Sequence, residues 1–170
     1  MNTPTLTRLR LAREEESATV LAWRNHPEVR KVMFTDHLIS PEEHAAWWPH
    51  TRNNPDYRLL IIEYGELACG IVTFSRMADR EACWLWGFYL NPDAFADGMD
   101  RLRAWNGMEQ ASLDYAKNKL GCNTLCCEVF AFNTAVLSMH LRYRFKESGR
   151  YPRQRGGEAL EVVQLERSIL

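Results

Sequence analysis

The sequence predicts a mixed α/β fold, and three observations lead to this prediction. Residues 84–92 read WLWGFYLNP, where large apolar side chains alternate around one glycine before Asn-Pro ends the run, as expected of a β-strand. Apolar residues recur at helical spacing over residues 108–120, and Gly121 follows as a stop signal. The predicted elements run from helices through an antiparallel meander to a β-α-β-α-β-β half, which indicates one mixed sheet with helices beside it.

Length and composition describe an ordinary globular chain. Its 170 residues, 46% hydrophobic and 25% charged, fit a single domain over residues 1–170. A formal net charge of −1 provides no broad basic field, so we expect no nucleic-acid partner. No apolar run approaches the roughly 20 residues that span a bilayer, and no signal peptide begins the chain. We therefore expect a cytoplasmic protein with no membrane partner.

The first third of the chain predicts one strand and three helices. Residues 5–11 alternate weakly and favour an opening strand, and residues 14–23 carry acidic side chains at the start of a helical pattern. The Asn-His-Pro sequence at 25–27 ends that helix, and residues 28–33 predict a second, short one. Ser40-Pro41-Glu42-Glu43 predicts the start of a third helix, with Ser40 as the cap of a capping box.

The middle of the chain predicts an antiparallel meander over residues 58–64, 67–76 and 80–90. Residues 84–90 carry large apolar groups on both faces, so we expect a central strand that is covered on both sides. A long polar turn over residues 91–107 is expected before the helix at 108–120. The chain then predicts a strand at 124–130, a helix at 134–143 and two strands at 145–151 and 158–167.

Several of these motifs resemble the GNAT superfamily of acyl-CoA-dependent N-acyltransferases. Cys127-Glu128-Val129, then Asn133, then a helix ending near Arg144-Phe145 is similar to the second half of that family. The resemblance covers nearly the whole chain. It implies a mostly antiparallel central sheet with a splayed central strand flanked by helices, and acetyl-CoA as the co-substrate.

A narrower resemblance concerns the acceptor. Residues 24–30 read RNHPEVR, and Ile39-Ser40, Glu43-His44 and residues 86–90 (WGFYL) accompany them. Together these are similar to the flagellin-sugar branch, which acetylates the 4-amine of a UDP-linked 4-amino-4,6-dideoxy sugar on the pseudaminic acid pathway. The acceptor contacts implied are Arg24, Asn25, Met33, Thr35, His37, Trp47 and Trp86. Arginine suits a diphosphate, and tryptophan suits stacking on uracil.

The resemblance also implies residues that hold acetyl-CoA. The strand near Gly87, Tyr89 and Leu90 is expected to lend backbone groups to the pantetheine and the thioester, and Asn133 to contact CoA. The family's usual Gln/Arg-x-x-Gly-x-Gly/Ala loop is missing, because residues 93–107 read DAFADGMDRLRAWNG. In its place, backbone N–H groups and arginine side chains of this stretch are expected to bind the pyrophosphate. The candidates are Gly98, Arg101, Arg103, Asn106 and Gly107.

The proton for the departing thiolate has three candidate sources. His140 stands seven residues after Asn133, where the family has a tyrosine. An imidazolium, with an ordinary pKa of about 6.5, is an adequate donor to a thiolate. Tyr143 shares that helical face one turn on, and water is the third source.

The general base is open between Glu63, Glu128, His37 and a water relay. His37, His44 and His50 lack the spacing of a metal site, so no metal is expected. The five cysteines contain no C-x-x-C pair, which favours buried reduced thiols.

Two other functions compete with the sugar acetyltransferase. Ribosomal-protein acetyltransferases begin with similar Arg-Asn helices, so the acceptor could be a protein amine. Because the pyrophosphate loop is altered, the domain could also be a degenerate acyl-CoA-binding module. We expect a monomer or a homodimer in each case.

Overall fold

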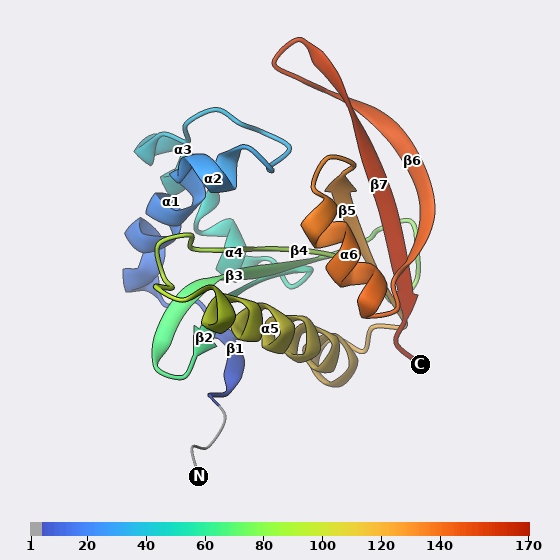
Figure 1. Cartoon of the computed structure of the whole chain (residues 1–170), viewed down its shortest axis with the longest axis horizontal. Coiled ribbons are helices and arrows are strands. Elements are labelled where there is room, and N and C mark those ends of the chain that lie inside the picture. Colours follow the sequence, from blue (N-terminus) through green and yellow to red (C-terminus); the bar gives the residue numbers. More distant parts are fainter. Residues whose placement is uncertain (1–4) are drawn as a thin grey trace.

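The computed structural model describes residues 5–170, in which a seven-stranded sheet carries helices on both faces (Figure 1). The elements, in chain order, are β1 (Thr7–Leu11), the 3-10 turn η1 (Glu14–Glu16), α1 (Ser17–Asn25), α2 (Pro27–Arg30), α3 (Pro41–Trp47), α4 (His50–Asn53), β2 (Tyr57–Tyr64), β3 (Leu67–Arg76), β4 (Cys83–Leu90), α5 (Gly98–Lys119), β5 (Thr124–Phe130), α6 (Thr134–Arg142), β6 (Lys146–Arg155) and β7 (Glu158–Ser168).

The strand order is β1-β2-β3-β4-β5-β7-β6, and every neighbouring pair is antiparallel except β4 with β5. The parallel pairing joins residues 83–85 to residues 124–126 and ends there. Beyond it, residues 86–90 of β4 still pair with β3, while residues 127–130 of β5 pair with β7. The two central strands therefore separate along their carboxyl-terminal halves. The predicted mixed fold and the splayed central strand are both confirmed.

Strand β4 takes part in two hydrophobic cores, one on each face of the sheet. Trp84, Trp86 and Leu90 lie in the core covered by α5 and α6. Tyr89 lies in the second core, which packs under α1, α2 and α3. In Figure 1, α1–α3 and α5 lie on opposite sides of β3 and β4, and α6 lies beside β5. The alternation in residues 84–90 therefore correctly predicts a central strand covered on both sides.

The amino-terminal helices differ in their limits from the prediction. The single helix predicted over residues 14–23 is a 3-10 turn followed by α1, which continues to Asn25, and the helix predicted over 28–33 is the single turn α2. Ser40 is the predicted cap, and its Oγ accepts a hydrogen bond from the Glu43 backbone N–H at 3.1 Å. The Glu43 carboxylate lies 3.0 Å from the His37 ring. The Ser-Pro-Glu-Glu sequence predicted the Ser40 cap but not this side-chain contact.

The polar turn predicted over residues 91–107 is wrong, because α5 begins at Gly98 and runs for 22 residues. The Asp97 side chain caps it by accepting a hydrogen bond from the Met99 N–H at 2.8 Å. Gly107 therefore lies inside the helix, where an added Cβ would collide with the side chain of Thr7 on β1. Close packing of α5 on β1 requires this glycine, which the sequence prediction had assigned to a loop.

The last hairpin is longer than predicted. Strand β6 extends to Arg155, and the turn consists of Gly156 and Gly157, which both have positive φ angles. Arg155 Nη1 donates to the carbonyl oxygens of Lys31 and Met33, at 2.8 and 2.9 Å. The tip of the β6–β7 hairpin is thereby fixed against the segment that follows α2, and Figure 1 shows it arching toward that side.

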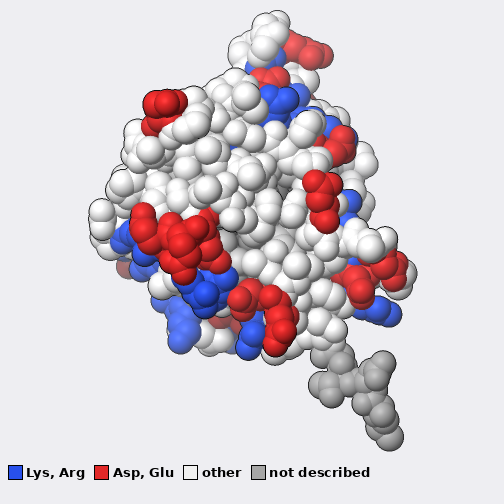
Figure 2. Space-filling model, turned by 90° about the vertical axis from the view of Figure 1, so that its left-hand side faces the viewer, with Lys and Arg blue, Asp and Glu red and all other residues white. Residues whose placement is uncertain are grey.

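Charged side chains are unevenly distributed over the face that carries α1–α3. Figure 2 shows acidic and basic groups around the rim of this face and a largely uncharged middle.

The five cysteines are buried free thiols, as predicted. No helix within residues 5–170 is long and apolar enough to cross a bilayer. The same residues contain no group of three His, Cys, Asp or Glu side chains arranged to hold a metal ion.

Candidate active site

A cavity of about 740 Å³ opens where β4 and β5 separate. Residues 86–90 and 127–129 line it from the two strands. The remaining walls come from α1, α2, α3, α5 and α6, from β2 and β3, and from the segment that follows α2. Splaying creates this space because two strands that no longer share hydrogen bonds leave room between their backbones. The predicted site residues that line the cavity are Arg24, Met33, Thr35, Trp47, Trp86, Gly87, Tyr89, Leu90, Arg101, Asn133 and His140.

Arg24, in the last turn of α1, is the main cation of the α1–α3 wall. Its Nη2 donates to the carbonyl oxygen and the Oγ1 of Thr35, at 2.8 and 2.9 Å. Its Nη1 is buried and has no hydrogen-bond partner among the described residues. Burial lowers the pKa of this guanidinium, although it remains charged at neutral pH. Arg24 therefore presents an oriented cationic donor without a partner to the cavity.

Two of the predicted acceptor contacts do not line the cavity. The Asn25 side chain donates to the Ile39 carbonyl and accepts from the Ile39 N–H, at 2.9 and 2.8 Å. It therefore holds the segment between α2 and α3 in place. His37 is about half exposed and lies 3.0 Å from Glu43.

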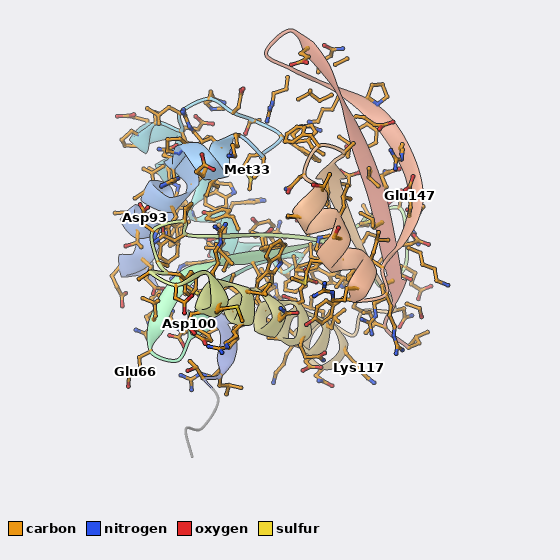
Figure 3. The ribbon with its side chains drawn as sticks, viewed as in Figure 1. Met33, Glu66, Asp93, Asp100, Lys117 and Glu147 are labelled. Atoms are coloured by element: carbon orange, nitrogen blue, oxygen red, sulfur yellow. The ribbon has the colours of Figure 1, made fainter. Side chains whose placement is uncertain are left out.

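Met33, by contrast, does line the cavity. It lies after α2 and faces the β5–α6 side of the molecule (Figure 3).

On β4, Gly87 borders open space. An added Cβ there would have one neighbour within 4 Å, the Oγ1 of Thr73 at 3.8 Å, so no crowding between tryptophans requires a glycine. The Tyr89 hydroxyl donates to the Val20 carbonyl at 3.3 Å, and burial raises the pKa of this phenol. Tyr89 thus fixes α1 to the sheet through its side chain.

The amino-terminal end of α5 lies beside the loop that follows β4, where Figure 3 labels Asp93 and Asp100. Arg101, in the first turn, lines the cavity. Arg103 is exposed and paired with Asp100 at 3.1 Å. Asn106 donates to the Leu102 carbonyl. Of the five predicted pyrophosphate contacts, the structure therefore brings only Arg101 to the cavity wall.

Helix α6 supplies two of the predicted residues to the cavity. Asn133 occupies its N-cap position without a side-chain capping bond, so the amide is not committed to the helix. Tyr143 lies outside the lining, and its hydroxyl donates to the carbonyl and the Oδ1 of Asn106, at 3.0 and 3.1 Å. Burial, with a contribution from the Glu109 charge, raises the pKa of Tyr143. His140 lines the cavity directly.

His140 is 2% exposed and is surrounded by aromatic rings. The ring centroids of Trp86, Phe145 and Phe88 lie 5.2, 5.3 and 6.0 Å from its own. Its Nδ1 lies 3.0 Å from Oε1 of Glu109, a side chain with no exposed surface. The pair is close without the alignment of a regular hydrogen bond. The imidazole of the cavity wall therefore meets a carboxylate buried behind it, in otherwise apolar surroundings.

Sequence reasoning missed Glu109, which lies behind His140 and does not itself line the cavity. Glu109 follows the buried Met108 on α5 and lies three and seven residues before the buried Ser112 and Ala116, a spacing that places it on the inner face. That spacing was the available signal. The lining residues that were not predicted include Val20, Tyr57, Ile71, Thr73, Phe88 and Trp105.

Comparison with known proteins identifies the family. Residues 7–146 match the family model described as an acetyltransferase (GNAT) domain. The chain belongs to the GNAT acetyltransferase family. It is therefore an acyl-CoA-dependent N-acetyltransferase, as the sequence motifs predicted.

Two curated relatives of this GNAT protein are similar over most of its length. Both are named acetyltransferase PseH and come from two strains of Campylobacter jejuni subsp. jejuni. They are 23% and 24% identical over 131 residues, which is 77% of this chain and 77% of each relative. This agrees with the resemblance to the flagellin-sugar branch.

Solved structures share the GNAT fold. Spermidine N-acetyltransferase from Vibrio cholerae, in complex with CoA and spermine, superposes with a TM-score of 0.81 at 14% identity and covers 95% of both chains. YncA from Salmonella typhimurium, with its cofactor acetyl-CoA, superposes with a TM-score of 0.74 at 16% identity and covers 96% of this chain and 94% of its own. At these identities the likeness shows the fold alone.

Proposed function

We propose that this GNAT protein transfers the acetyl group of acetyl-CoA to the 4-amine of a UDP-linked 4-amino-4,6-dideoxy sugar. The observation that carries the proposal is the buried Nη1 of Arg24, which has no partner and belongs to the cavity wall formed by α1–α3. A guanidinium nitrogen that is buried without an acceptor is costly, and a diphosphate would supply that acceptor. The match to relatives named PseH supports the same acceptor class.

The residues of the splayed strands fit acetyl-CoA. Gly87 leaves space beside the β4 backbone, and Asn133 presents a side chain without a capping bond. Arg101 lines the cavity in the first turn of α5, where helix N–H groups favour phosphate. We assign the thioester end to the β4 backbone near Gly87 and Leu90, and the pyrophosphate to the start of α5. When bound, acetyl-CoA supplies the activated acyl group.

His140 is the acid that the geometry favours. It lines the cavity, whereas the Tyr143 hydroxyl is bonded to Asn106 outside the lining. His140 protonates the sulfur as the C–S bond breaks, which removes the need to expel a thiolate into an apolar space.

Glu128 is the base candidate that the structure supports. It lines the cavity, and its two oxygens accept hydrogen bonds from the Tyr151 hydroxyl at 3.0 Å and the Gln164 amide at 3.1 Å. Glu63 instead pairs with Arg10 at 2.6 Å and does not line the cavity. Glu128, held by these two donors, removes a proton from the acceptor amine directly or through a water molecule.

A panel of acceptors tests the proposal. The purified chain is given acetyl-CoA with one of four compounds: the UDP-linked 4-amino sugar, the same amino sugar without UDP, a UDP-sugar without an amine, or peptides with free amino termini. We expect the highest kcat/KM for the first, a raised KM for the second and no turnover of the third. Faster turnover of the peptides would contradict the proposal and favour a protein acetyltransferase.

A further inference from the structure

Glu109 of α5 is a carboxylate in an unusual place. Within residues 5–170 it is the one Asp or Glu side chain that is fully buried, with no exposed surface. Neither of its oxygens accepts a regular hydrogen bond. Buried carboxylates are normally paired or hydrogen-bonded, because an isolated one loses its hydration without replacement. Such a side chain keeps a negative charge only where a positive group lies beside it.

The titratable side chain in contact with Glu109 is His140. Its Nδ1 lies 3.0 Å from Oε1 of Glu109. The other titratable groups around the pair are the thiol of Cys127 on β5 and the phenol of Tyr143 on α6; burial first, and then the Glu109 charge, raises the pKa of both. These two therefore remain neutral near pH 7. The positive charge of Arg142, at the end of α6, acts in the opposite direction and lowers the pKa of Tyr143.

The surroundings make each member of the pair depend on the other. Trp86, Phe88 and Phe145 enclose His140, and burial among such rings favours a neutral imidazole. A neutral imidazole in an apolar wall is a poor acid for a departing thiolate. A carboxylate at 3.0 Å reverses this preference, because attraction between opposite charges is strong where water is excluded.

We propose that Glu109 is a positioning residue that keeps His140 in its imidazolium form, with the Nδ1–H directed at the carboxylate. The proposal rests on the proposed function, since it explains how His140 is loaded with the proton that it gives to the sulfur. As the amine nitrogen bonds to the acyl carbon, the C–S bond breaks and its electron pair goes to sulfur. His140 releases its proton to that sulfur and Glu128 takes up the proton lost by the amine; exchange with solvent then returns a proton to His140 and removes one from Glu128.

The charge of His140 is measured first in the protein without ligand. Nitrogen NMR of protein labelled at the histidine ring nitrogens distinguishes an imidazolium from a neutral ring, and a His140→Asn variant assigns the signal. We expect wild-type His140 to be an imidazolium at neutral pH and to become neutral in Glu109→Gln, which keeps the shape but removes the charge. Asp114→Asn, at an exposed position of the same helix, is the control and should leave the signal unchanged.

Kinetics give the second readout. Glu109→Gln should lower kcat about 100-fold, as expected for loss of a general acid, without changing the KM for acetyl-CoA. The alkaline limb of its kcat profile should move to lower pH. Glu109→Asp, which keeps a carboxylate, should recover part of the rate and of the imidazolium signal.

A neutral His140 in the wild-type protein would overturn the proposal, even if Glu109→Gln does not fold. An unchanged signal and an unchanged pH profile in a folded Glu109→Gln would also overturn it. Failure of the proposed function is a separate result: the UDP-linked sugar would not be acetylated, while the NMR signal would still report the charge of His140.

Discussion

Two histidine–glutamate pairs in this protein have the same separation between their side chains and differ in how far those side chains are exposed to solvent. His37 and Glu43 lie 3.0 Å apart with side chains 54% and 50% exposed. His140 and Glu109 also lie 3.0 Å apart, with side chains 3% and 0% exposed. In water the first pair gains little, because solvent screens both charges. In the second pair, water is excluded, and neither the imidazolium nor the carboxylate could keep its charge there without the other. Environment, not distance, decides what such a pair does.

The largest expected effect comes from removing one member of each pair. His140→Phe leaves the Glu109 carboxylate buried without a counter-charge, so we expect a loss of about 3–5 kcal/mol in the free energy of unfolding. His37→Phe should change it by no more than about 0.5 kcal/mol. Urea unfolding of both variants measures the difference. Similar losses in the two variants would show that burial does not distinguish the pairs.

Removing both members of the buried pair should undo most of that loss. In the double variant Glu109→Leu/His140→Phe no charge is buried, and well-packed apolar replacements of buried ion pairs are often neutral or stabilising by about 1–4 kcal/mol. We expect unfolding close to that of the wild type, with kcat as low as in His140→Phe. A double variant that is less stable than His140→Phe would contradict the buried ion pair.

A half-buried arginine and an exposed one extend the comparison to substrate binding. Arg24→Met removes the unpartnered guanidinium of the cavity wall and should raise the KM for the UDP-linked sugar about 10- to 100-fold, or about 1.4–2.8 kcal/mol. The KM for acetyl-CoA should not change. Arg8→Met, at an exposed side chain on β1, is the matched control and should leave both values unchanged. Steady-state kinetics that show equal effects of the two substitutions would remove Arg24 from the acceptor site.

The smallest expected effect concerns a third histidine, His44, whose ring lies at 3.0 Å from Ser17 Oγ. Burial lowers its pKa. The unfolded chain therefore takes up a proton near the ordinary value of about 6.5, while the folded chain does so only at lower pH. Stability should fall as the pH drops below that value, and His44→Gln should flatten this slope. Parallel pH slopes for variant and wild type would contradict the role of His44.

The sequence predicted the parts of the fold that depend on local pattern. Alternation over residues 84–90 predicted a strand buried on both faces. The resemblance to the GNAT family, which has a tyrosine seven residues after the position of Asn133, pointed to His140, and His140 lies in the cavity wall. The start of α5 was missed, because Gly98 and Gly107 have the composition of a loop. Only the close packing of Gly107 on Thr7 explains its place inside a helix.

The sequence could not predict the buried pair. Glu109 and His140 are 31 positions apart, on two helices whose approach depends on the tertiary fold. A glutamate within a helix normally indicates an exposed face, so propensity and composition pointed away from the core. Likewise, Asn25 and Tyr143 carry polar groups suited to a site, and the fold commits them to Ile39 and Asn106.

The central claim is that the gap between β4 and β5 holds acetyl-CoA, and Gly87→Val tests it most directly. A valine there would fill open space without a close neighbour, so the fold should be kept while the ligand loses its place. Calorimetry should detect acetyl-CoA binding to the wild type and none to Gly87→Val, with urea unfolding of the two proteins alike. Binding of acetyl-CoA to a folded Gly87→Val with wild-type affinity would contradict the account.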